Sequence, residues 1–245
     1  MSKRFTHANV KWWDEFYAPQ RGGGGPRFPP SSFAKLCQDT AWARGCDVLD
    51  IGAGDGRDSF LLGSDAARIV PVDISEVAVK AMRAAGLTPV CASAAELPAP
   101  CALFAAAGLA EPLAEGSTTP RRPLAVYSRF SLHALEPAEA DAFLLWCATH
   151  AARVAIETRS VNDPRFGRGT PVGDNAFVDT HYRRFTRLTD LTAKLHSLGF
   201  RVVLAEEDFE AAGAPGDAAV VNRIFAERPV TTTATPASHS HRPAA

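Results

Sequence analysis

The residues best suited to bind a ligand follow a short apolar segment in the first quarter of the chain. Asp50 stands near the end of this segment, and three glycines at alternate positions come directly after it. Because glycine has no Cβ and tolerates positive φ, such a turn lets the backbone approach a ligand closely. A second apolar segment ends at Asp73, seventeen residues after the last glycine. Nucleoside-binding βαβ units place a carboxylate there to accept hydrogen bonds from ribose hydroxyls. The glycines are Gly52, Gly54 and Gly56.

The spacing of these glycines separates two classes of cofactor. Dinucleotide sites use G-x-G-x-x-G with a pyrophosphate at the helix N-terminus, whereas here the third glycine comes one residue earlier. Asp50 and Asp55 lie in or beside the turn, and their charges would repel a pyrophosphate. S-adenosylmethionine has no phosphate and carries a sulfonium and an α-ammonium, so acidic groups favour it. An NAD-linked oxidoreductase is therefore the weaker alternative.

An acidic residue followed by G-x-G-x-G, with the spaced Asp73, resembles the class I S-adenosylmethionine-dependent methyltransferases, over roughly residues 30–227. The resemblance implies S-adenosylmethionine as cofactor, with Asp50 facing the α-amino group of its methionine part and Asp73 facing the ribose. Family members often carry Asp where this chain has Ser93, so the adenine contact is expected at Ser93 or Ala94. Further cofactor contacts are predicted at Tyr17, Gly52, Gly54, Gly56, Arg57, Ile74 and Ser128.

Apolar segments that alternate with helical patterns predict an α/β fold with a doubly wound, mainly parallel sheet and helices on both faces. The last two segments are joined without an evident helix, which predicts an antiparallel pair at one sheet edge. The family resemblance likewise implies a seven-stranded sheet with an antiparallel edge strand. Strands are expected at 47–51, 68–72, 88–92, 124–128, 152–157, 200–206 and 217–226, and helices at 9–18, 31–42, 57–62, 75–83, 137–150 and 187–198.

The sequence divides into three parts. Residues 1–30 are predicted to form an aromatic helix and a Gly/Pro-rich arm, residues 31–228 the methyltransferase domain, and residues 229–245 a disordered tail with too little apolar content to pack. The polar stretch 158–186 lacks a regular pattern and is expected to form an irregular lid over a substrate. The aromatic side chains of the first part either fold over the cofactor, where their faces suit a sulfonium, or simply dock that helix on the domain.

Composition narrows the range of partners. The 245 residues are 46% hydrophobic and 22% charged with a net charge of −1, so no electrostatic footprint for a nucleic acid or an anionic membrane is evident. Neither a bilayer-spanning segment nor a signal peptide is apparent, which predicts a cytoplasmic protein. The expected partner is a small-molecule substrate. Five scattered cysteines without a C-x-x-C pair are expected to be free thiols, and no metal site is predicted.

Basic and histidine side chains gather after the fourth and fifth strands, at the sheet end where ligands bind. Arg129 and His133 follow the fourth strand, and Arg159 follows the fifth. Arginine binds carboxylate and phosphoryl groups bidentately, and histidine titrates near neutral pH and can act as a general base. Alternatively, Arg183 and Arg184 are exposed to solvent, or they pair with Glu157 and Asp163. The predicted substrate contacts are Arg129, Glu157, Arg159, Tyr182, Arg183 and Arg184, and the predicted catalytic residues are His133, His181 and Arg129.

The leading hypothesis is metal-free transfer of the cofactor methyl group to an oxygen of a small anionic metabolite. The fourth strand does not end in the Asn/Asp-Pro-Pro-Tyr/Phe motif of N-methyltransferases that act on nucleobases or protein glutamine. N- or S-methylation of a small molecule and a non-catalytic nucleoside-binding module are the alternatives. Tyr-Ser-Arg-Phe-x-Leu-His after the fourth strand and His-Tyr-Arg-Arg-Phe within 158–186 resemble a bacterial small-molecule branch, related to tellurite-resistance-type methyltransferases and to those of capsule and antibiotic pathways.

Overall fold

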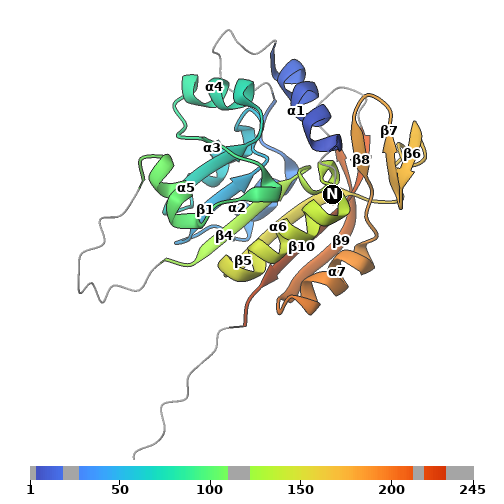
Figure 1. The fold of residues 1–245 in the computed structure, drawn as a ribbon. Coiled ribbons are helices and arrows are strands. Elements are labelled where there is room, and N and C mark those ends of the chain that lie inside the picture. The colour runs from blue at the N-terminus through green and yellow to red at the C-terminus, as the bar shows by residue number, and fades with distance from the viewer. Residues whose placement is uncertain (1–3, 19–27, 110–121, 212–217, 230–245) are drawn as a thin grey trace, which may run out of the picture.

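A mainly parallel sheet of seven strands forms the centre of the structure (Figure 1), a computed structural model that describes residues 4–18, 28–109, 122–211 and 218–229. The strand order is β3-β2-β1-β4-β5-β10-β9, and β10 runs antiparallel to both of its neighbours. The predicted fold class and the antiparallel pair at one edge are confirmed, with β10 one position in from the edge strand β9. The strands are β1 (Asp47–Ile51), β2 (Arg68–Asp73), β3 (Val90–Cys91), β4 (Leu124–Arg129), β5 (Arg153–Arg159), β9 (Arg201–Ala211) and β10 (Ala218–Glu227).

Helices cover both faces of this sheet (Figure 1), and alternate residues of each strand pack against opposite layers. On one face the β1 side chains Leu49 and Ile51 share a core cluster with residues of α5, α6 and α7. On the other face Val48 packs with residues of α2 and α3. The helices are α1 (Arg4–Tyr17), α2 (Ser32–Asp39), α3 (Arg57–Leu62), α4 (Glu76–Ala84), α5 (Pro100–Ala106), α6 (Pro137–His150) and α7 (Leu188–Ser197).

Local sequence signals explain where several of these helices begin. Ser31 precedes α2, and its Oγ accepts a hydrogen bond from the Ala34 amide at 3.0 Å. Ser75 caps α4 in the same way, accepting from the Ala78 amide at 3.1 Å. Each cap satisfies an amide that the first helical turn leaves without an intrahelical partner. The cap at Ser75 also fixes the chain immediately after Asp73.

The stretch 158–186 differs from its sequence-based prediction. Instead of an irregular segment, it contains a second, three-stranded antiparallel sheet of β6 (Thr170–Gly173), β7 (Ala176–Val178) and β8 (Tyr182–Arg184). These strands are three or four residues long, too short for an alternating pattern to stand out. The small sheet lies beside α1 in Figure 1, and β8 contacts the short 3₁₀ helix Leu132–Ala134 after β4.

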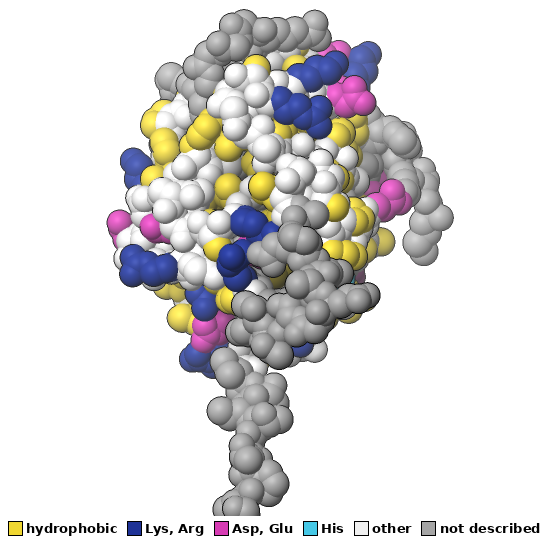
Figure 2. All heavy atoms as spheres, turned by 90° about the vertical axis from the view of Figure 1, so that its left-hand side faces the viewer, with side chains coloured by type: hydrophobic (Ala, Val, Ile, Leu, Met, Phe, Trp, Pro, Cys, Tyr) yellow, Lys and Arg dark blue, Asp and Glu magenta, His cyan; other side chains and the backbone are white. Residues whose placement is uncertain are grey.

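The surface carries charges of both signs. On the face shown in Figure 2, basic and acidic side chains are interspersed with apolar ones across the described residues. No helix in the described part of the chain combines the length and apolar character needed to cross a bilayer. The predicted glycine-rich arm around 19–27 and the predicted tail beyond residue 229 lie outside the described residues.

Candidate active site

A cavity of about 410 Å³ opens at the carboxyl ends of β1, β2 and β4, and α1 forms its opposite wall. This is the position at which doubly wound sheets bind their ligands. Most of the predicted site residues line it. From the predicted cofactor set these are Tyr17, Asp50, Gly52, Gly54, Arg57, Asp73, Ile74, Ser93 and Ala94; from the predicted substrate and catalytic sets they are Arg129, His133, Arg159, His181 and Arg183.

The glycine turn brings bare backbone to the cavity wall. The amides of Gly52 and Ala53 both donate to the Val72 carbonyl of β2, at 2.8 and 3.1 Å, and the Gly54 amide donates to the Asp73 carboxylate at 2.8 Å. Gly52 and Gly54 adopt φ of +78° and +61°, which side chains rarely tolerate. A Cβ at Gly54 would lie 2.4 Å from the Tyr17 hydroxyl. The turn thus needs glycine both for its conformation and for the close approach of its neighbours.

Two buried carboxyl groups at this end have raised pKa values. Asp73 accepts from the amides of Gly54 and Ser75, each at 2.8 Å, and burial raises its pKa to about 6. Asp50 accepts from the Ser59 hydroxyl at 2.5 Å, and burial raises its pKa to about 8. All of these donors are neutral, so burial outweighs their hydrogen bonds in setting each pKa. A ligand cation placed here would stabilise the ionised carboxylates.

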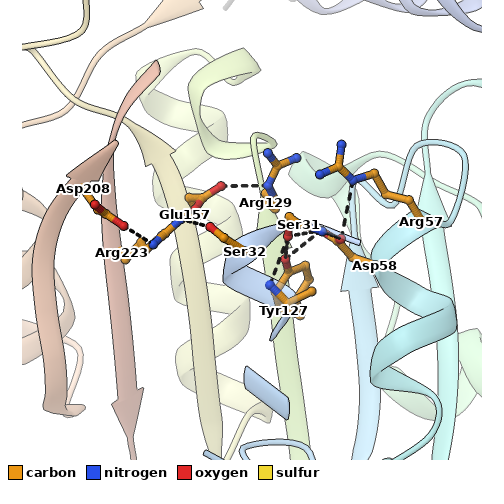
Figure 3. Close-up of polar contacts among 10 residues, drawn as sticks. Ser31, Ser32, Arg57, Asp58, Tyr127, Arg129, Glu157, Asp208 and Arg223 are labelled. Atoms are coloured by element: carbon orange, nitrogen blue, oxygen red, sulfur yellow. Dashed lines mark hydrogen bonds and ion pairs between the residues drawn. The ribbon is translucent and has the colours of Figure 1, made fainter. Parts of the chain in front are cut away.

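Asp58, at the start of α3, has a structural set of partners. Its carboxylate accepts from the Ser31 amide at 2.7 Å, the Ser31 hydroxyl at 2.8 Å and the Tyr127 hydroxyl at 2.8 Å (Figure 3). Arg57 lies beside it, with Nε 3.6 Å from the Asp58 carboxylate. These contacts join α2, α3 and β4 beneath the glycine turn. Sequence reasoning missed Tyr127, whose ring is fully buried in β4.

A row of charged side chains begins at the cavity-lining Arg129 and crosses four adjacent strands, β4, β5, β10 and β9 (Figure 3). Glu157 forms an ion pair with Arg129 on one side, with 2.8 Å between Nε and the carboxylate, and accepts a hydrogen bond from Arg223 Nε at 2.8 Å on the other. Arg223 also pairs with Asp208 of β9 and donates to the Ser32 hydroxyl. Sheet register produces this row, because Glu157 lies opposite both arginines in the pairing of β5 with its neighbours. Glu157 is fully buried and does not line the cavity.

Two further arginines line the cavity and have carboxylate partners. Arg159 pairs with Asp163 at 2.7 Å, and Arg183 pairs with Asp179. The alternative in which Arg183 pairs with Glu157 or Asp163 is not the one observed, because Arg183 pairs with Asp179 while those two carboxylates pair with Arg129, Arg223 and Arg159. Arg165, which sequence reasoning did not propose as a site residue, lines the cavity as well.

Both predicted catalytic histidines line this end and are neutral at physiological pH. Burial, followed by the nearby charge of Arg159, lowers the pKa of His133 well below its usual value. Burial and the charge of Arg183 lower the pKa of His181 to about 3. His133 Nδ1 has no hydrogen-bond partner among the described residues, whereas His181 Nδ1 lies 3.1 Å from the Thr180 hydroxyl.

The helix α1 lies over the cavity and is hydrogen-bonded to the domain at two positions. Asn9 donates to the Ala134 carbonyl at 3.1 Å and accepts from the Tyr182 amide at 3.2 Å. Five residues further on, Asp14 accepts from the Ser75 hydroxyl at 2.6 Å. The aromatic side chains of α1 line the cavity, so they form one of its walls as well as docking the helix on the domain. These side chains are Trp12, Trp13, Phe16 and Tyr17.

Five predicted site residues do not line the cavity. Gly56 faces α4, where an added Cβ would meet Leu87 and Met82. Ser128 is fully buried in β4, Tyr182 is buried in β8 with a pKa raised by burial to about 12, and Arg184 is half-buried at the end of β8. Glu157, the fifth, lies between Arg129 and Arg223. No group of three or more His, Cys, Asp or Glu in the described part of the chain is arranged to hold a metal ion.

Comparison with known proteins identifies the fold. No protein-family model and no curated protein matches the sequence of this chain. Among solved structures, the methyltransferase CcbJ from Streptomyces caelestis is similar with a TM-score of 0.60 at 14% identity, over 89% of this chain and 97% of that one. Magnesium protoporphyrin IX methyltransferase from Synechocystis, solved with bound S-adenosylmethionine, gives a TM-score of 0.54 at 14% identity over 94% and 86%.

A third similar structure contains both a substrate and the demethylated cofactor. The 1,6-didemethyltoxoflavin-N1-methyltransferase of Burkholderia thailandensis, with bound 1,6-didemethyltoxoflavin and S-adenosylhomocysteine, gives a TM-score of 0.56 at 16% identity over 93% of this chain and 91% of that one. At these identities the likeness is one of fold. The chain therefore has the α/β Rossmann-like fold of S-adenosylmethionine-dependent methyltransferases.

Proposed function

We propose that this chain is an S-adenosylmethionine-dependent methyltransferase that acts on a small anionic acceptor, with O-methylation favoured. The observation that carries the proposal is the separation of charge along one cavity. Buried carboxyl groups and bare backbone form the end at the glycine turn, and arginines and neutral histidines form the other end. A cationic, phosphate-free donor fits the first end, and an anion fits the second.

The residues at the glycine turn would hold the cofactor. Asp73 has the position to accept from the ribose, Asp50 lies where an α-ammonium would offset its burial, and Ser93 and Ala94 line the cavity beyond β3. Gly52 and Gly54 leave room for close approach. The bound cofactor would supply an electrophilic methyl group. A nicotinamide dinucleotide fits less well, because its pyrophosphate would face Asp50, Asp55 and Asp73.

The opposite end would hold the acceptor. Arg129, Arg159 and Arg183 keep fixed orientations through their carboxylate partners, which preorganises them for an anion. An ionised oxygen needs no strong base, which agrees with the lowered pKa values of His133 and His181. N- or S-methylation is the second candidate, because His133 Nδ1 is available within the described residues to accept a proton.

The finer assignments rest on sequence. The motifs after β4 and in 158–186 favour a bacterial small-molecule branch related to tellurite-resistance-type and antibiotic-pathway enzymes. All five cysteines are free, two of them exposed, in keeping with the reducing cytoplasm.

A two-step experiment tests the proposed function. Thermal unfolding is first measured with S-adenosylhomocysteine and with NAD, and only the former is expected to raise Tm, because a ligand stabilises the state that binds it. The protein and S-adenosylmethionine are then incubated with small carboxylates, phosphates, amines and thiols, and products are scored for one added methyl group by mass. Stabilisation by NAD alone would refute the cofactor assignment. Cofactor binding without any methylated product would favour the non-catalytic module.

A further inference from the structure

Aromatic rings alternate with charged groups at the acceptor end of the cavity. The Trp12 indole lies over the His181 imidazole, with ring centroids 3.8 Å apart and planes inclined by 32°. Phe130 lies near two cations, with its ring centroid 4.4 Å from the Arg129 guanidinium carbon and 5.1 Å from that of Arg159. The edge of Phe130 also meets His133, at 5.6 Å between centroids and an interplanar angle of 87°. An anion bound by these arginines would therefore sit among ring faces.

The backbone holds Phe130 at this position at an energetic cost. Its φ of 55° is in the left-handed region, which costs a non-glycine residue about 1–2 kcal/mol. The Phe130 amide donates to the Glu157 carbonyl at 2.9 Å, which fixes the residue at the end of β4. Strained residues that persist in this way gather at ligand sites. The Phe130 ring lines the cavity beside both guanidinium groups.

Apolar surface on α1 faces the same space. Trp12, Trp13 and Phe16 are only half-buried although they line the cavity. Asn9 fixes their helix to the arginine end through Ala134 and Tyr182. A flat ring placed there would cover the aromatic side chains and gain stacking energy, about 0.5–1.5 kcal/mol beyond area burial for each aromatic pair. A bare phosphate or an aliphatic acid would not make these ring contacts.

We propose that the acceptor is a flat aromatic or heteroaromatic ring that carries a carboxylate. The ring stacks against α1 and Phe130, and the carboxylate binds Arg159 and Arg183. The proposal deepens the proposed function and rests on it, because it names the acceptor class of that same site. His133 and His181 line the same part of the cavity and are neutral, so they add no positive charge beside the arginines.

Binding of three matched compounds tests this proposal. Benzoate, cyclohexanecarboxylate and benzamide are titrated by calorimetry into protein saturated with S-adenosylhomocysteine. Benzoate is expected to bind at least tenfold more tightly than either of the others, since the second lacks the ring and the third lacks the charge. Equal affinity for cyclohexanecarboxylate would overturn the stacking contribution, and equal affinity for benzamide would overturn the role of the arginines.

Tryptophan variants connect the preference to α1. Trp12→Leu should abolish the preference for benzoate over cyclohexanecarboxylate, and Trp12→Phe should retain it. Trp146→Phe is the control and should leave the preference unchanged, because Trp146 lies on α6 with its indole N–H donating to the Pro98 carbonyl. A preference that survives Trp12→Leu would overturn the proposal. The S-adenosylhomocysteine titration of the same samples separates the two conclusions. Failure of that titration alone would refute the cofactor site, whereas normal cofactor binding without a benzoate preference would refute the acceptor class.

Discussion

The two ends of the cavity differ in charge and in how they are built. The end at the glycine turn consists of backbone and of carboxyl groups that accept from neutral donors, all within the segment from Asp50 to Ser75. The arginine end consists of long side chains from several elements, each held by a carboxylate. Asp50 and Asp73 at the first end accept hydrogen bonds from neutral donors, whereas the arginines at the other end are paired with carboxylates. Loss of one residue at the glycine turn should therefore mainly lower ligand affinity. Loss of one residue at the arginine end should mainly lower the free energy of unfolding.

The largest effect on ligand binding is expected at Asp73. Asp73→Ala removes the acceptor for the Gly54 and Ser75 amides and the proposed acceptor for the cofactor ribose. The affinity for S-adenosylhomocysteine in calorimetry should fall more than about 100-fold, or about 3 kcal/mol. Asp39→Asn, on the exposed end of α2, is the matched control and should bind normally. Tight binding by a folded Asp73→Ala protein would disprove the cofactor end.

At the arginine end, Glu157→Gln should act mainly on folding. It leaves Arg129 and Arg223 buried without their shared carboxylate, and breaking a buried pair costs about 3–5 kcal/mol. Urea unfolding should show this loss, while Glu227→Gln, which breaks the more exposed pair with Arg201, should cost less than about 1 kcal/mol. Similar losses in the two variants would mean that the charged row across β4, β5 and β10 contributes no more than a surface ion pair.

The smallest expected effect is a dependence of stability and ligand affinity on pH, which arises from the carboxyl groups at the glycine turn. A carboxyl group whose pKa is raised by folding contributes stability that is full below its unfolded pKa and is lost as pH rises through the folded value. Asp73 and Asp50 therefore destabilise the unliganded protein progressively between about pH 4 and the values of about 6 and about 8. An ammonium ligand pairs with the ionised form, so S-adenosylhomocysteine should bind about tenfold more tightly at pH 8 than at pH 6.

Asp50→Asn is the variant that tests this pH effect. It should reduce the change in affinity between pH 6 and pH 8, because it removes the group whose pKa is about 8. An unaltered pH profile in this variant, or a wild-type affinity independent of pH, would contradict the assignment of a cation to the buried carboxyl groups.

The same contrast explains what the sequence could predict. The glycine turn and its two acids are local, so spacing alone placed them, and the strands and helices around them were expected close to their observed bounds. The arginine end depends on contacts between distant segments. Arg223 meets Glu157 only through antiparallel pairing of β10 with β5, and Asn9 meets Tyr182 across 173 residues. Glu157 has a residue type that suits substrate binding, and only the structure shows that two arginines enclose it.

The two fastenings of α1 have a consequence for how this protein could change its chemistry. The helix lies outside both sheets, and two short polar side chains, Asn9 and Asp14, hydrogen-bond it to the domain. Substitution of its aromatic residues would change the shape of the cavity at the arginine end, where the acceptor is proposed to bind, and would leave the central sheet and the row of ion pairs intact. Under the proposed function, the fourteen residues of α1 would supply one wall of the acceptor site, and Phe130, Arg159 and Arg183 of the domain would supply the rest.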